Sequence, residues 1–336
     1  RMNKGWGIPI PWDREQVIYV WFDALLNYLT GVGFGTDHEM FQKWWPADCH
    51  LIGKDITRFH CILFPAMILA YNAAFDDGTE LAMPKKVYSH GFLYEKKNEK
   101  MGKISKSSGG GVGTISQLLD DYGPDAYRYY FLAKCRYHDD SEFSRDDFLN
   151  VYNADLANNL GNMVSRVNAM IHKYFDGSLP VVQIPPHRSI RWVAESTLNH
   201  YRKHMDAFEY HYALQYVWGI LDRCNEYIDR EKPWILAKDE PQKGTDRLAV
   251  VLRNCVSCLR VVSILLQPLL PQSSDEIYGT FFPFRCHSKN PDTAGDWPNL
   301  DWEYLNSMYD HEDLEHMSMG MIITFDKITL FPRVKE

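Results

Sequence analysis

HLIGKDI (residues 50–56) is a short apolar run that ends in a glycine followed by a charged pair. The run predicts a buried strand that ends at Gly53, with Lys54 and Asp55 at the mouth of a helix. Ligand sites on open parallel sheets lie at the carboxyl ends of their strands. Residues 50–56 therefore predict a nucleotide-type site at the end of a strand.

The residues on either side of this run repeat a strand-then-helix pattern between residue 17 and about residue 135. VIYVWF (17–22) predicts a strand and ALLNYLTGVGF (24–34) a helix, and DITRFHCILFPAMILAYNAAF (55–75) predicts a long helix before a strand in KVYSHGFLY (86–94). Strands separated by helices of this length are typical of βαβ units. We expect an α/β fold with a partial Rossmann-like parallel sheet in residues 1–143.

The pattern becomes almost entirely helical from about residue 150 to residue 280. The stretch 144–175 opens with Ser144 and acidic residues, a good helix start, and then repeats apolar positions every three or four residues. Further helices are predicted for residues 188–208, 211–230 and 244–267, with residues 231–244 as a loop. We expect an all-α helical bundle over residues 144–284 and a tail, residues 285–336, that packs back on it.

Composition limits the function classes. Lys and Arg number 36 against 44 Asp and Glu, a net charge of −8, so nucleic-acid contacts would depend on local patches such as the lysine-rich residues 85–106. The seven cysteines argue against a disulfide framework. Cys255 and Cys258 have CxxC spacing inside an apolar run, where a core role is favoured over metal or redox chemistry.

The sequence contains no apolar stretch of about 18 uncharged residues, so no membrane span is expected. The reducing environment implied by the cysteines predicts a cytoplasmic protein, and we expect it to be a monomer.

KISKS (103–107) places two lysines three residues apart on a glycine-rich segment. Lysine side chains on a mobile loop can converge on a triphosphate and stabilise charge that develops during nucleotidyl transfer. Such a run alone is more often a solvated loop, and only its neighbours favour the functional interpretation.

Those neighbours are YVWFDALLNYLT (19–30), HLIGKDITRFH (50–60), HGFLYEKKNEKMGKISKS (90–107), and NADLANNLGNMVSR (153–166) followed by EKPW (231–234). In this order and spacing they resemble the landmarks of methionyl-tRNA synthetase, a class I aminoacyl-tRNA synthetase. KISKS would be the KMSKS loop of that class, with Ile104 in place of methionine. The resemblance runs from residue 5 to about residue 280 and implies a Rossmann-type catalytic domain followed by an anticodon-binding helical domain.

The resemblance implies a methionine-binding pocket. The matching residues are Trp21, Ala24, Tyr28, Ile56 and His60. Aromatic faces and a branched aliphatic wall suit a polarisable thioether, and Tyr28 and His60 would meet its sulfur. The alternative is that Trp21 and Tyr28 are only core residues. Leu25 stands where the family often has proline.

The resemblance also implies an ATP site and a pair of catalytic lysines. The residues that match the ATP site are Gly53, Asp55, Gly91, Leu93, Lys103, Ser105 and Lys106. Gly53 permits close approach and Asp55 would accept hydrogen bonds from the ribose. Lys103 and Lys106 would hold the pyrophosphate side, with Lys106 the stronger candidate for stabilising the transition state. Lys54 could equally be a surface residue.

Asn162, Arg166 and Trp234 match the positions that read the methionine anticodon in the family. Splayed bases are recognised by stacking on aromatic rings and by hydrogen bonds to their edges. Asn162 and Arg166 lie four residues apart, on one face of a predicted helix. The alternative for Trp234 is a packing anchor.

The family also has a histidine-x-glycine-histidine motif whose histidines face the triphosphate, and none of the 13 histidines here belongs to one. We therefore expect a carboxyl-terminal portion of the synthetase that lacks the first half of the sheet and is inactive alone. The alternatives are a naturally truncated tRNA-binding module and one half of a split synthetase.

For the whole enzyme the resemblance implies methionine–tRNA ligase activity in translation. The carboxylate of L-methionine attacks the α-phosphate of ATP with Mg²⁺ present, and a ribose hydroxyl of methionine tRNA then attacks the adenylate. No zinc site is expected in this chain, because the zinc-bearing segment of the family precedes the matched residues.

Overall fold

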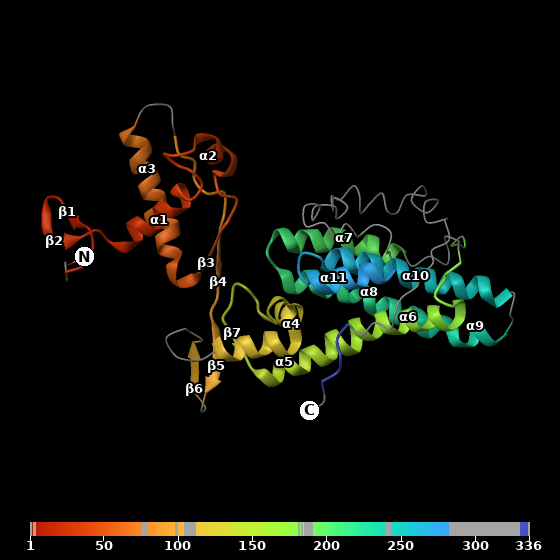
Figure 1. Ribbon diagram of the computed structural model, residues 1–336. Helices are drawn as coiled ribbons and strands as arrows, with labels where there is room; N and C mark the ends of the chain where they lie inside the picture. Colours follow the sequence, from red (N-terminus) through yellow and green to blue (C-terminus); the bar gives the residue numbers. More distant parts are fainter. Residues whose placement is uncertain are drawn as a thin grey trace. The chain divides into compact units, whose positions relative to one another are not determined.

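The computed structural model describes residues 2, 5–75, 80–97, 100–103, 112–180, 182, 184, 191–239, 243–281 and 330–334. The chain divides into two compact units (Figure 1). The first unit contains Arg1–Leu93 and Tyr137–Ser141, and the second contains Tyr94–Arg136 and Glu142–Glu336. The functional domain limits at residues 143 and 284 remain a prediction.

The first unit is built on a parallel pair of strands, β3 (His50–Gly53) and β4 (Val87–His90). His50 pairs with Val87 and Gly53 with His90, so both strands end at the same edge. The connection between them contains a 3-10 turn, η1 (Lys54–Ile56), a π-helix, η2 (Phe59–Leu63), and helix α3 (Phe64–Ala74). This βαβ unit confirms the predicted parallel sheet.

Helices α1 (Val20–Thr30) and α2 (His38–Trp44) complete the first unit, after a short antiparallel pair, β1 (Pro9–Ile10) and β2 (Asp13–Val17). The core joins α1 to α3 through Leu25, Leu29, Phe64 and Ile68, each no more than 3% exposed. Full burial of each side chain contributes about 1.5–3 kcal/mol. Packing therefore fixes α1 against the helix that follows η2.

The strand expected over VIYVWF (17–22) is wrong, because β2 ends at Val17 and α1 begins at Val20. The run is apolar and β-branched, so its local propensity favours a strand. Helical packing decides otherwise, because Leu25 and Leu29 lie four residues apart and are both buried.

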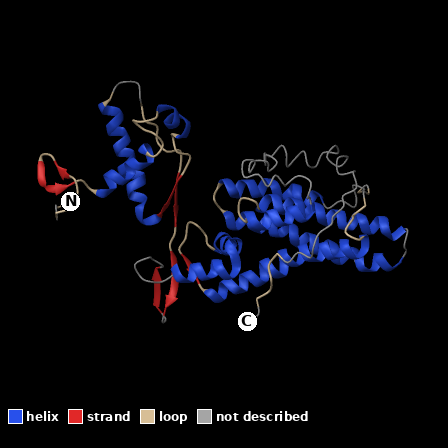
Figure 2. Cartoon of the chain, viewed as in Figure 1, coloured by secondary structure: helices blue, strands red, loops and turns tan. Residues whose placement is uncertain are grey.

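A three-stranded sheet, in the order β6–β5–β7, follows β4 along the chain. It consists of β5 (Leu93–Lys97), β6 (Lys100–Lys103) and β7 (Ser141–Phe143). β5 and β6 are antiparallel, with Tyr94 opposite Lys103. All strands among the described residues precede α5, as the colouring in Figure 2 shows.

The second unit is mostly helical. Its helices are α4 (Val112–Lys134), α5 (Arg145–Val151), the π-helix η4 (Tyr152–Gly161), α6 (Asn162–Phe175), α7 (Arg191–Asp206), α8 (Tyr210–Glu231), α9 (Pro233–Asp239), α10 (Lys243–Leu266) and α11 (Pro271–Phe281). Ser144 caps α5 by accepting a hydrogen bond from the Asp147 N–H at 3.0 Å, as the sequence predicts. The helical region confirms the fold class inferred from residues 144–284.

Helix α10 forms the centre of this unit. Residues Arg247–Leu266 are long and apolar enough to span a membrane by composition, but 89% of the most apolar window is buried inside the protein. Cys255 and Cys258 lie in this buried stretch, at 0% and 5% exposure. The CxxC pair is thus part of the core, the interpretation that the sequence favours.

The structure differs from the sequence prediction in one connection of this half and describes only part of its tail. The predicted loop over residues 231–244 is wrong in part, because Pro233–Asp239 form α9 with proline in the first turn, where its missing N–H costs nothing. The tail predicted to pack back on the bundle is residues 285–336, of which only 330–334 are described. There the Tyr152 hydroxyl donates to the Pro332 carbonyl at 3.0 Å, and Phe331 is 8% exposed against the helical core.

Candidate functional site

The predicted methionine residues come from three consecutive elements of the first unit. Trp21, Ala24 and Tyr28 are spaced by three and four residues on α1, so they share one face of that helix. Ile56 ends the 3-10 turn η1, and His60 belongs to the π-helix η2. Short π-helical segments are frequent at functional sites, because the extra residue redirects a side chain.

His60 joins α1 to the connection after β3. Its Nδ1 lies 3.0 Å from the Ile56 carbonyl, and its Nε2 lies 2.9 Å from the Tyr28 hydroxyl. A carbonyl can only accept, so Nδ1 donates to it, and in the neutral form of the ring Nε2 then accepts the Tyr28 O–H. The chain Tyr28–His60–Ile56 thus fixes both the ring orientation and the tautomer.

Aromatic contacts of Trp21 add to the hydrogen bonds around His60. The Trp21 ring stacks on Phe59 with a centroid distance of 4.3 Å and an interplanar angle of 10°, and its edge faces His60 at 6.0 Å. His60 is 2% exposed, whereas Tyr28 is 38% exposed. Burial raises the pKa of Tyr28, so its hydroxyl stays protonated at neutral pH. The structure brings Trp21, Tyr28, Ile56 and His60 together.

His50, the first residue of β3, is a member of this cluster that sequence reasoning missed. Its ring stacks under Tyr28 at 4.2 Å and meets His60 edge-on at 5.8 Å. It is 4% exposed, and neither ring nitrogen has a hydrogen-bond partner among the described residues. Burial, followed by the neighbouring His60, lowers its pKa. A histidine opening an apolar strand carries no periodic signal, so only tertiary packing reveals it.

His50 predicts a pH dependence of stability. Because its folded-state pKa is lowered, the unfolded chain takes up a proton near pH 6.5, about where a free histidine titrates, while the folded chain does not. The free energy of unfolding should therefore fall as the pH drops through that range. In His50→Phe, which keeps the stacking, this fall should be smaller. Urea unfolding of both proteins at pH 7.5 and 5.5 measures it, and equal falls would contradict the assignment.

Apart from Lys103, the described ATP-site candidates lie at or just after the carboxyl ends of β3 and β4. Gly53 ends β3, and a Cβ added there would lie 2.9 Å from an Asp55 carboxylate oxygen. Gly91 directly follows β4, and its N–H donates to the Tyr137 carbonyl at 2.7 Å. A side chain at Gly91 would overlap the backbone of Asp139 and Asp140. A side chain at either position would crowd neighbouring atoms of the chain, and the approach of ATP to Gly53 stays a prediction.

Residues 137–141 support this edge, which the sequence did not reveal. Asp140 accepts the Phe92 N–H at 2.8 Å and pairs with the Lys54 ammonium at 2.6 Å. The Lys54 ammonium also lies 4.9 Å from the centre of the Phe92 ring. Lys54 is thus tied to the strand end by an ion pair, and with a side chain 44% exposed it is also the surface residue that the sequence allowed. Leu93 follows as the first residue of β5.

The lysine motif is described only at its start. Lys103 ends β6, opposite Tyr94 in the hairpin. Ser105 and Lys106 lie outside the described residues, so their predicted roles stay predictions. Among the described residues, no group of three or more His, Cys, Asp or Glu side chains is arranged to hold a metal ion.

Two of the three anticodon candidates touch in the second unit. The Arg166 guanidinium lies 5.4 Å from the centre of the Trp234 ring, a cation–π contact. Arg166 also pairs with Asp229 of α8 at 3.0 Å. Asn162 lies one turn before Arg166 at the start of α6 and is exposed. Trp234 is 37% exposed, so part of its face is open to a base.

Two family models match the chain. The model of class I (M) tRNA synthetases matches residues 2–168, and that of the anticodon binding domain of methionyl tRNA ligase matches residues 188–310. The chain belongs to the methionyl-tRNA synthetases of class I. The motifs that carry the resemblance in the sequence thus indicate the correct family.

Curated relatives belong to the same family as the two matching models. Methionine–tRNA ligases from Caldanaerobacter subterraneus subsp. tengcongensis and from Clostridium acetobutylicum are each 42% identical, over 281 and 280 residues. The matches cover 83% and 82% of this chain, and 42% and 41% of the two relatives. The chain thus spans about two fifths of the length of the relatives it matches.

Solved structures are similar over the whole chain. Mycobacterium tuberculosis methionyl-tRNA synthetase in complex with methionyl-adenylate is 30% identical with a TM-score of 0.77, covering 99% of this chain and 59% of that one. The apo form of the same protein gives 28% identity and a TM-score of 0.74.

Proposed function

We propose that this chain carries the methionine, ATP and anticodon sites of a methionine–tRNA ligase. The enzyme would activate L-methionine with ATP and transfer it to methionine tRNA for translation in the cytoplasm. Residues 1–143 would supply the second half of the catalytic domain and residues 144–284 the anticodon-binding domain.

The observation that carries the proposal is the cluster around His60. A thioether is apolar and polarisable, so aromatic faces and a polar edge suit it better than a purely aliphatic pocket. Trp21 stacked on Phe59 offers the faces, and the Tyr28 hydroxyl bonded to His60 offers the edge. The M. tuberculosis neighbour, which binds methionyl-adenylate, supports the same ligand class here.

The remaining roles follow from charge and position. Asp55, beside Gly53 at the end of β3, would accept hydrogen bonds from the ribose of ATP, and the backbone from Gly91 to Leu93 would face the adenine. Lys103 and Lys106 would stabilise the charge that develops on the pyrophosphate when the methionine carboxylate attacks the α-phosphate. The protein would contribute positioning and charge rather than a covalent nucleophile. Mg²⁺ would accompany ATP, and we assign it no ligand in this chain.

The 336 residues should not form methionyl-adenylate at a useful rate by themselves. They contain no histidine-x-glycine-histidine motif, so the histidines expected opposite the lysine loop are absent from this sequence. The measurement is methionine-dependent exchange of pyrophosphate into ATP by the purified chain. Exchange comparable to that of a full-length relative would refute the prediction.

A second candidate function follows from the same missing motif. The chain could serve as a tRNA-binding module, or as one half of a split synthetase whose other half carries the histidines. The His60 cluster and the strand-end glycines favour the ligase proposal, because a pure tRNA-binding module has no use for them. The gene distinguishes these alternatives. An open reading frame that continues upstream through a histidine-x-glycine-histidine motif supports the ligase proposal.

A further inference from the structure

We propose that Glu231 and Arg247 are positioning residues, which hold Trp234 at the angle at which an anticodon base stacks on its ring. The inference rests on the anticodon assignment proposed above and adds two residues to it. Arg247 lies outside the motifs that carry the family resemblance, and Glu231 is the first residue of EKPW but has no role among the anticodon candidates.

The joint that carries Trp234 has an unusual backbone. Helix α8 ends at Glu231, α9 begins at Pro233, and the single residue between them, Lys232, is left-handed with a φ of 48°. A residue with a Cβ in this conformation costs roughly 1–2 kcal/mol. The Lys232 carbonyl accepts the Ile235 N–H at 2.8 Å, which closes the first turn of α9. Contacts around the joint must therefore hold it in place.

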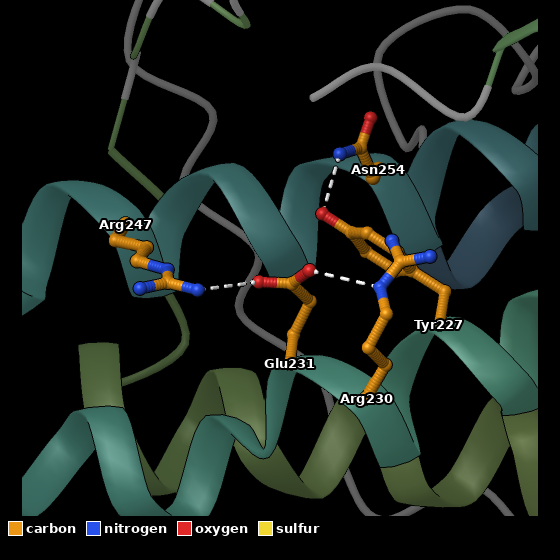
Figure 3. Close-up of polar contacts among 5 residues, drawn as sticks. All are labelled: Tyr227, Arg230, Glu231, Arg247 and Asn254. Atoms are coloured by element: carbon orange, nitrogen blue, oxygen red, sulfur yellow. Dashed lines mark hydrogen bonds and ion pairs between the residues drawn. The ribbon is translucent and has the colours of Figure 1, made fainter. Parts of the chain in front are cut away.

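Glu231 supplies the nearest of those contacts. One carboxylate oxygen accepts a hydrogen bond from Arg230 at 3.2 Å, and the other accepts from Arg247 of α10 at 3.0 Å (Figure 3). The Glu231 side chain is 18% exposed. Burial alone would raise its pKa, but the hydrogen bonds from Arg247 and Arg230 lower it. The carboxylate is therefore charged at neutral pH, and it ties the end of α8 to α10.

A second contact joins the same two helices one turn earlier on α8. Asn254 of α10 donates to the Tyr227 hydroxyl at 2.8 Å, as Figure 3 shows. Tyr227 and Asn254 are 4% and 2% exposed, and burial is the main cause that raises the pKa of Tyr227 to about 12. We call the contacts among Tyr227, Arg230, Glu231, Arg247 and Asn254 the α8–α10 clamp. Two cross-links four residues apart on α8 fix the direction in which the chain leaves that helix.

The Trp234 ring itself is contacted from α6. Arg166 lies against the indole and pairs with Asp229, two residues before Glu231. The α8–α10 clamp fixes the direction of the backbone from which Trp234 projects. Arg166 fixes the orientation of the indole ring. Loss of the clamp should leave the helices folded, because the core of α8 and α10 is apolar, but should loosen the joint.

The charges of Glu231 and Arg247 separate a positioning role from a purely electrostatic effect on RNA binding. Glu231→Gln removes a negative charge, so electrostatics alone would strengthen RNA binding. Arg247→Gln removes a positive charge, so electrostatics alone would weaken it. A positioning role predicts that both substitutions weaken binding, and that the double variant is no worse than the more affected single variant, since one contact is lost in each case.

The experiment measures binding of the 336-residue chain to two labelled RNA hairpins at fixed salt, one with the methionine anticodon CAU and one with a changed anticodon. For the CAU hairpin we expect Glu231→Gln and Arg247→Gln each to weaken binding about fivefold. Glu231→Gln should leave the binding of the changed hairpin the same or slightly tighter. Its thermal unfolding midpoint should stay close to that of the unaltered chain.

Glu226→Gln is the matched control, because it removes a carboxylate on the same helix whose ion pair among the described residues stays within α8, with Arg223 at 3.1 Å. It should not weaken binding of the CAU hairpin. The inference is overturned if Glu231→Gln binds that hairpin as tightly as the unaltered chain or tighter, or if it weakens both hairpins equally. Trp234→Ala separates the two proposals. If that variant also binds the CAU hairpin normally, the anticodon assignment itself fails.

Discussion

Trp234→Ala should weaken binding of a methionine-anticodon hairpin by about 1–3 kcal/mol, the usual cost of losing one aromatic ring under a base. The indole is 37% exposed and lies against the Arg166 guanidinium, so the ring is held by one contact while part of its surface is accessible. A ring held on one side loses little conformational freedom when a base stacks on the other. Fluorescence anisotropy of a labelled hairpin at fixed salt gives the two dissociation constants.

The control for this measurement is Trp192→Ala. Trp192 lies on α7 and is 59% exposed, so its removal tests whether any surface tryptophan of the second unit affects RNA binding. We expect no change in affinity. Equal losses for the two variants, or an unchanged affinity for Trp234→Ala, would argue that Trp234 is only a packing residue.

His60→Ala should reduce the stability of the first unit by about 2–4 kcal/mol, because it creates a cavity and leaves polar groups unpaired. The imidazole is 2% exposed and bonds to both the Tyr28 hydroxyl and the Ile56 carbonyl. Hydrogen exchange of the backbone amides in α1 and α3 reports this stability region by region. Faster exchange is expected in both helices.

The matched change for that experiment is His38→Ala, since His38 is an exposed histidine at the start of α2 in the same unit. Its effect should stay within about 0.5 kcal/mol. If His60→Ala exchanges no faster than His38→Ala, His60 does not hold α1 to the η2 segment. The proposed thioether site would then lose its polar edge.

Much of the architecture could be predicted because local and tertiary preferences agree. HLIG is apolar and ends in glycine, and it forms β3 in a parallel pair. Ser144 followed by acidic residues begins a helix in the sequence and in the structure. The helices expected at 188–208, 211–230 and 244–267 lie within three residues of α7, α8 and α10.

The errors in secondary structure arise where tertiary contacts override local preference. VIYVWF has strand propensity, yet α1 begins inside it so that Leu25 and Leu29 can be buried. EKPWILAKDEPQKG contains two prolines and several charges, which suggest a loop, yet the first proline starts α9. Helices this short depend on packing, which periodicity does not report.

For the candidate site, the sequence motifs named residues that the structure brings together, such as Tyr28 with His60 and Arg166 with Trp234. They did not name the residues that support them. His50 under Tyr28 and Asp140 at Phe92 are contacts across 22 and 48 residues of sequence, and no local pattern marks them. Supporting side chains are therefore the part of a site that only the structure reveals.

The most direct test of the account compares the affinity of the unaltered 336-residue chain for two RNA hairpins that differ only in the anticodon. Reading a base edge by hydrogen bonds and stacking discriminates by about 1–3 kcal/mol per base. We predict that the chain binds the hairpin with the methionine anticodon CAU at least about tenfold more tightly than a hairpin with a changed anticodon. Equal affinities at the same salt concentration would contradict the claim that this chain reads the methionine anticodon.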